Sequence, residues 1–116
     1  MKVSLKGTNI ALLESTREYV DRKLVRMVEK LLARDEEPIA LDIEVGKTTR
    51  HHRAGKIFRA EANLSVGWTL LRAEALGETL NEAIDLVEEE LTREIKKFKE
   101  KRRTMLLKGA RKIKGK

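Results

Sequence analysis

Apolar and polar residues alternate along several short segments of the chain, and this alternation predicts β-strands. Residues 39–45, 57–66 and 69–76 carry aliphatic side chains at about every second position. A period of two is typical of strands that bury one face against a core. A shorter alternation over residues 3–5, which stops at Gly7, predicts one further strand at the N-terminus.

Two longer segments repeat their apolar residues at steps of three and four, which predicts amphipathic helices. The first helix is expected over residues 13–33. The second is expected to begin at Thr79, which forms a capping-box pattern with Glu82, and to end near residue 103. The apolar stripe of the first helix is predicted along Thr16, Val20, Leu24, Met27 and Leu31, with Val28 and Leu32 beside it.

The order of these elements is β-α-β-β-β-α, which predicts an α+β fold. We expect a four-stranded sheet with two helices packed on one face and a polar, hydrated second face. The chain has 116 residues, which is the size of one domain. We therefore expect one α+β domain over residues 1–103 and a basic, flexible C-terminal tail over residues 104–116.

The composition excludes several kinds of site. The chain has no cysteine, which excludes disulfides, thiolate zinc sites and cysteine nucleophiles. No apolar run approaches the roughly 18 residues of a membrane span, and the N-terminus lacks the apolar core of a signal peptide. Aromatic residues make up only 3% of the chain, so a platform for stacked bases is not expected.

No motif predicts catalysis or metal binding. Gly46, Lys47 and Thr48 resemble the end of a phosphate-binding loop, but Leu41 stands where that motif requires a glycine. Two adjacent histidines, residues 51–52, lie in a loop without a nearby carboxylate. We therefore expect a protein that is not an enzyme and that uses no metal, cofactor or small-molecule substrate.

The net charge of +7 is concentrated at one end of the chain. Residues 96–116 carry eleven lysines and arginines and one acid, so this segment has a charge of +10 and the remainder of the chain −3. A basic block of this kind favours a polyanionic partner, either a nucleic acid or an acidic membrane surface. The alternative is a tail that only improves solubility.

A second basic feature is predicted on the first helix. At about 100° per residue, Lys23, Arg26 and Lys30 fall in one row with Tyr19, beside the apolar stripe. A one-sided basic row fits a phosphate backbone. The alternative is that the aliphatic parts of these side chains lie along the edge of the core without binding any partner. Because both helices are expected on one sheet face, this row could join the basic end of the second helix.

Several segments between residues 6 and 99 match a known family, and they follow one another in the order that the family has. They include His51-His52-Arg53-Ala54-Gly55-Lys56 and Leu71-Arg72-Ala73-Glu74-Ala75. The set resembles the short ribosome hibernation-promoting factors, also called ribosome-associated inhibitors or sigma-factor modulation proteins. The chain departs from the family at residues 79–81, where many members carry Asp-Met-Tyr. The matching segments are residues 6–10, 17–20, 23–24, 51–61, 71–75, 82–85 and 89–99.

The resemblance implies the same β-α-β-β-β-α fold and a non-enzymatic, cytoplasmic role. Members of this family bind the small ribosomal subunit in the channel that mRNA and tRNA occupy, and so they stop translation in stress or stationary phase. The expected partners are rRNA phosphates, without a membrane, and we expect a monomer away from the ribosome. Long members carry a second domain that pairs ribosomes, and we expect this chain to lack it.

The predicted mechanism is steric occlusion of the channel, held by electrostatic contacts to rRNA. Two alternatives remain: a general module for structured RNA that acts away from the ribosome, and a protein-interaction domain that uses the polar sheet face. The expected RNA-binding residues are Lys23, Arg26, Lys30, Arg50, Arg53, Lys56, Arg93, Lys96, Lys97, Lys99, Lys101, Arg102 and Arg103.

Overall fold

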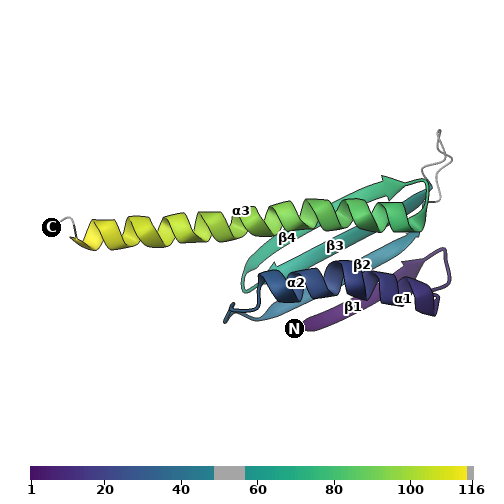
Figure 1. Ribbon diagram of the computed structural model, residues 1–116, viewed down its shortest axis with the longest axis horizontal. Helices are drawn as coiled ribbons and strands as arrows, with labels where there is room; N and C mark the ends of the chain where they lie inside the picture. The colour runs from purple at the N-terminus through teal and green to yellow at the C-terminus, as the bar shows by residue number, and fades with distance from the viewer. Residues whose placement is uncertain (49–56, 115–116) are drawn as a thin grey trace.

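In the computed structural model, four strands form one sheet and the helices cross one of its faces (Figure 1). The structure describes residues 1–48 and 57–114, with side chains through residue 109. The strands lie in the order β1-β2-β3-β4, with β1 parallel to β2 and the other neighbours antiparallel. The predicted α+β fold is confirmed. The strands are β1 (Lys2–Thr8), β2 (Ile39–Lys47), β3 (Phe58–Val66) and β4 (Thr69–Gly77).

The sheet buries one face, as its alternating pattern predicts. Register pairs bring Leu41 of β2 opposite Leu64 of β3, and Leu64 opposite Leu71 of β4, so that aliphatic side chains share the helix side. These three residues are 9% exposed or less. The other face, called the open face below, carries the remaining positions. The buried residues of the sheet are Leu41, Ile43, Val45, Gly46, Ala60, Ala62, Leu64, Val66, Leu71, Ala73 and Gly77.

The first predicted helix forms, but it contains one wide turn. Its parts are α1 (Glu14–Val20), the π-helical turn η1 (Asp21–Val25) and α2 (Arg26–Leu31). At this turn the N–H of Arg26 donates to the carbonyl of Asp21, five residues earlier. A π turn acts as a one-residue insertion in a helix and therefore shifts the phase of the residues that follow it.

This phase shift moves the buried stripe of the helix. Beyond the turn, Val28 and Leu32 are buried, whereas Met27 and Leu31 are half-buried. The prediction had placed Met27 and Leu31 at the centre of the stripe, one residue too early in each case. The sequence pattern assumed a uniform α-helix, so the prediction was wrong by the one residue that the π turn adds.

The last helix, α3 (Leu80–Lys114), begins at the predicted capping box. The N–H of Glu82 donates to Thr79 Oγ1 at 3.0 Å, and the Glu82 carboxylate accepts the N–H of Glu78 at 3.2 Å. The first bond satisfies a backbone donor that the helix N-terminus leaves free, and the second ties Glu82 to the residue before the cap. The side chains that α3 buries against the sheet are Ala83, Ile84, Val87, Leu91 and Ile95.

Helix α3 runs past its predicted end near residue 103 and continues to Lys114, beyond the edge of the sheet (Figure 1). Residues 104–114 are therefore helical, whereas the sequence predicts a helix that ends near residue 103, followed by a basic, flexible tail. No proline interrupts this segment, and lysines near a helix C-terminus are favoured by the helix dipole. The flexibility expected for residues 104–116 stays a prediction.

Both helical segments and the sheet share one hydrophobic core. Val20 and Leu24 of the first segment lie in the same buried cluster as Leu91 of α3 and Ile43 of β2. This arrangement fixes α1–α2 and α3 side by side on one sheet face, where their polar sides form a common surface. Among the described helices, none is long and apolar enough to cross a membrane.

Candidate nucleic-acid interface

The acidic first half of α3 lies against the middle of the first helical segment. Tyr19 donates its hydroxyl hydrogen to Asp85 at 2.5 Å, and the Lys23 ammonium lies 3.6 Å from both Asp85 and Glu88. The carboxylates of Glu88 and Asp85 raise the pKa of Lys23, and the hydrogen bond to Asp85 raises the pKa of Tyr19. Lys23, a predicted RNA-binding residue, therefore joins two helices of the same molecule.

The other two members of the predicted basic row lie at the surface. Arg26 is 70% exposed and forms one ion pair, at 3.3 Å, with Asp21 on its own helical segment. Lys30 is exposed as well. The structure thus divides the row: Lys23 faces α3, and Arg26 and Lys30 face solvent.

Two basic residues of α3 hold this helix against the end of α2. Lys99 donates to the carbonyl of Leu31 at 2.8 Å, and Leu31 is the last residue of α2. Carbonyls at a helix C-terminus lack partners within the helix and carry partial negative charge, so they favour a cation. Arg102 forms a 2.8 Å ion pair with Asp35 and lies over the ring of Phe98, 4.3 Å from its centroid. Lys99 and Arg102 therefore stabilise the fold.

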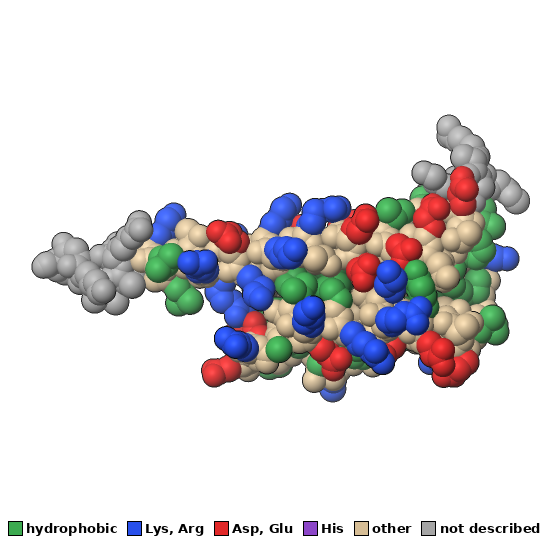
Figure 2. All heavy atoms as spheres, in the orientation of Figure 1, with side chains coloured by type: hydrophobic (Ala, Val, Ile, Leu, Met, Phe, Trp, Pro, Cys, Tyr) green, Lys and Arg blue, Asp and Glu red, His purple; other side chains and the backbone are tan. Residues whose placement is uncertain are grey.

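A shallow groove lies where these helices meet, and its lining is mostly basic. It lies between the end of α2 and the middle of α3, and three of the predicted RNA-binding residues, all from α3, line it. Figure 2 shows lysine and arginine side chains over both helical segments on this side of the molecule. The groove is lined by Leu31, Lys96, Lys99, Glu100 and Arg103.

The remaining predicted residues of α3 are exposed. Arg93, Lys97 and Lys101 face solvent, and Lys97 has one ion pair, to Glu94 at 3.7 Å. The predicted loop contacts at Arg50, Arg53 and Lys56 lie outside the described residues. In the part of the chain that the structure describes, no group of three or more histidines, aspartates or glutamates is placed to hold a metal ion.

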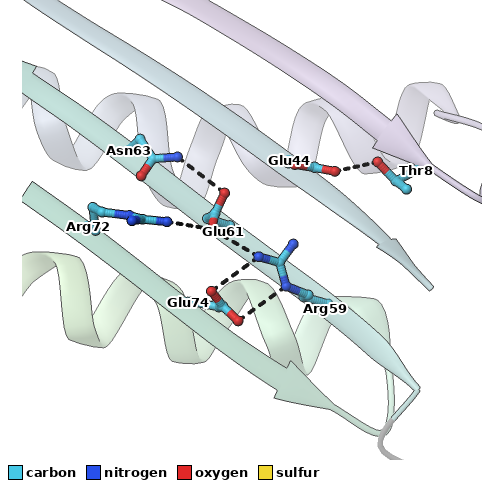
Figure 3. A network of polar contacts seen from close by, with 7 residues as sticks. All are labelled: Thr8, Glu44, Arg59, Glu61, Asn63, Arg72 and Glu74. Carbon is cyan, nitrogen blue, oxygen red and sulfur yellow. Dashed lines mark hydrogen bonds and ion pairs between the residues drawn. The ribbon is translucent and has the colours of Figure 1, made fainter. Parts of the chain in front are cut away.

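The open face of the sheet pairs its charges internally. Arg59 lies 2.9 Å from Glu61 and 3.1 Å from Glu74, and Arg72 lies 3.2 Å from Glu61 (Figure 3). Burial of Glu61 opposes its ionisation, but the hydrogen bond from Asn63 and the charges of Arg59 and Arg72 outweigh burial and lower its pKa.

This network was not predicted from the sequence. Its cross-strand ion pairs are diagonal, with Glu61 directly opposite Glu74, so they become visible only once the β3–β4 register is known. Because the arginines of the open face are paired with carboxylates, the helix side offers a polyanion more unneutralised cations.

Comparison with known proteins shows the family and the fold of this chain. A family model described as Sigma 54 modulation protein / S30EA ribosomal protein matches residues 3–103. A ribosome hibernation promotion factor from Picosynechococcus sp. is 30% identical over 102 residues, which cover 87% of this chain and 50% of that protein. The chain thus spans about half the length of this curated relative.

Two solved structures share the fold. The crystal structure of the Thermus thermophilus Protein Y N-terminal domain has a TM-score of 0.65 and 27% identity, covering 84% of this chain and 99% of that chain. A ribosomal subunit interface protein from Coxiella burnetii has a TM-score of 0.60 and 20% identity, covering 85% of this chain and 98% of that chain. The resemblance read from the sequence is confirmed: the chain belongs to the Sigma 54 modulation protein / S30EA ribosomal protein family.

Proposed function

We propose that this chain is a ribosome hibernation factor that binds the small ribosomal subunit at the mRNA and tRNA channel and blocks translation. The observation that carries this proposal is the exposed basic surface on the helix side of a fold shared with this family. The protein acts by binding, without catalysis, in the cytoplasm. Residues 1–103 form the ribosome-binding domain, and the basic C-terminal part extends the contact along the channel.

The surface fits rRNA phosphates better than rRNA bases. Lys30, Lys96 and Arg103 are exposed, and long cationic side chains suit phosphate oxygens. Aromatic residues for base stacking are scarce, at 3% of the chain. Phosphate contacts position a protein without reading sequence, so the shape of the rRNA cleft must supply the specificity.

The test is cosedimentation with separate small and large subunits at two salt concentrations, together with a cell-free translation assay. The double variant K96E/R103E should bind small subunits roughly tenfold or more weakly, because two cations of the groove are reversed. Its logarithmic salt slope should fall by about 2, one unit for each cation. The matched control is Lys2→Glu on β1, which reverses one exposed charge away from the groove.

Two results would contradict the proposal. Binding to small subunits that does not weaken with salt would exclude an interface made of phosphate contacts. Equal binding to large subunits or to bulk duplex RNA would favour the second candidate, a general module for structured RNA. That candidate is supported by the same basic surface, which would suit any folded RNA, and it predicts no block of mRNA or tRNA loading.

A further inference from the structure

Strand β4 forms one edge of the sheet, and no other described strand pairs with its outer side. It is nine residues long, from Thr69 to Gly77. A long edge strand presents unpaired backbone donors and acceptors and is a template for pairing with a further strand. Leu70 and Leu76 on the open face are 57% and 40% exposed, near the two ends of this edge.

The opposite edge is different. β1 carries Lys2 and Lys6 on the open face, and lysines on an edge strand disfavour pairing with another chain. On β4 the charged residues of the open face are instead one arginine and one glutamate, Arg72 and Glu74, at equal distances from Ala73. The sequence of β4 is thus self-complementary about its central residue.

We propose that two copies of this chain associate through β4, in antiparallel register about a two-fold axis at Ala73. This register places Arg72 opposite the partner's Glu74 and Leu70 opposite the partner's Leu76. It also uses the full strand, because Thr69 meets the partner's Gly77. Opposite charges and apolar pairs that face each other across strands stabilise a sheet.

Neighbouring registers are less favourable. An axis at Arg72 would set this arginine against its own copy, and an axis at Glu74 would do the same to the glutamate. Like charges directly opposite each other are destabilising. A register shifted by a single residue would pair side chains of the helix side with side chains of the open face. The Ala73 register alone joins unlike charges on both sides of the axis.

The ion pairs of the open face continue across this axis. Within one copy, Glu74 pairs with Arg59 and Arg72 pairs with Glu61 (Figure 3). The Arg72 and Glu74 side chains nevertheless remain 62% and 54% exposed, so each is available to a second partner. Pairing Arg72 with the partner's Glu74 joins the two networks into one series of alternating charges.

Helix α3 fits the same symmetry. It packs on β4 and β3 and runs opposite to β4, so the axis sets the two copies of α3 side by side and antiparallel (Figure 1). Strands lie roughly 5 Å apart, so a helix above the β3–β4 junction lies roughly 5 Å from the axis, measured across the strands. The two helices would then be about 10 Å apart, which is an ordinary packing distance.

The flank of α3 that would meet its copy is partly apolar. At about 100° per residue, the flank turned away from α2 carries Leu86, Glu90 and Lys97, and Leu86 is 40% exposed.

The basic groove does not take part in this interface. Lys99 faces α2, and the groove that it lines with Lys96 and Arg103 lies on that side of α3. The proposed dimer is therefore independent of the proposed ribosome binding. It is measured on the protein without ribosomes. It differs from the monomer that the sequence predicts.

The experiment is sedimentation equilibrium of the full chain, of R72E, of E74R and of an equal mixture of the two variants. Each variant alone should raise the dimer Kd about tenfold or more, because both contacts at the axis become like-charged. The mixture should regain the dimer, since each contact then joins opposite charges. The matched control Lys2→Glu, on the other edge, should dimerise like the unmodified chain.

A cross-linking experiment tests the register. The chain has no cysteine, so a single introduced cysteine is the only thiol of each variant. A mixture of L70C and L76C chains should form a disulfide-linked dimer on oxidation, and either variant alone should not, because those positions lie far from their own copies. A monomer at every soluble concentration, failure of the R72E and E74R mixture to recover, or cross-linking of L70C with itself would overturn the proposal.

Discussion

At the scale of single residues, charges in this protein have two distinct uses. Lys23 and Arg102 pair with carboxylates of other elements and so hold helices in place. Lys30 and Lys96 are exposed to solvent and are available to a partner. The sequence alone could not separate these groups, because Lys23 is adjacent to Asp85 only through the packing of two helices distant in sequence.

Glu61 supplies a pH-dependent contribution to stability. Its pKa is lower in the folded chain than in the unfolded chain, because the hydrogen bond from Asn63 and the arginine charges outweigh burial. The unfolded chain therefore binds the proton more readily. The stabilisation is present above the unfolded pKa and is lost as pH falls through the folded pKa.

We expect the Glu61→Gln variant to lose less stability than the unmodified chain as pH is lowered through the acid range. The measurement is the free energy of unfolding from urea denaturation at a series of pH values. Glu36→Gln, which changes an exposed glutamate in the loop before β2, is the matched control and should keep the unmodified pH dependence. Parallel pH curves for E61Q and the unmodified chain would contradict this assignment.

At the scale of elements, patterns in the sequence predicted the features that depend on interactions between residues close in the chain. Alternation located the four strands, and the capping box located the start of α3. The π turn η1 was not predictable, since it has no sequence signal of its own. The end of α3 was misplaced because the prediction relied on the apolar repeat, whose last member is Phe98, whereas a helix can continue beyond its last apolar contact.

The Thr79→Ala variant should destabilise the protein by about 0.5–2 kcal/mol, because the N–H of Glu82 loses its side-chain acceptor. The free energy of unfolding in urea measures this change. Thr104→Ala alters an exposed threonine far along the same helix and should change stability by less than about 0.5 kcal/mol. Equal effects of the two substitutions would show that the cap contributes nothing.

At the scale of the whole molecule, α3 determines the shape. The molecule measures 61 × 28 × 19 Å, and its long dimension follows the helix that projects beyond the sheet (Figure 1). Met105, Leu106 and Leu107 on this projection are all more than half exposed, so they add nothing to the core. The projection is therefore not needed to build the core of the domain.

A chain shortened to residues 1–103 should keep its melting temperature but bind small subunits with a shallower salt dependence. The deletion removes five lysines and arginines and no acid, and each lost phosphate contact reduces the logarithmic salt slope by about 1. Thermal unfolding by circular dichroism and a binding series across salt concentrations measure the two effects. An unchanged slope would show that the projection does not contact rRNA.

The projecting helix also gives the molecule a large electric dipole moment along its long axis. The positive end lies at the tip of α3, and residues 1–95 carry a net negative charge. In the field of a polyanion this dipole experiences a torque, which turns the tip of α3 toward the polyanion before any contact is made. Such pre-orientation speeds association, and it weakens as added ions shorten the range of the field. For the rRNA partner proposed above, the basic end of α3 thus sets the rate of association as well as the strength of binding.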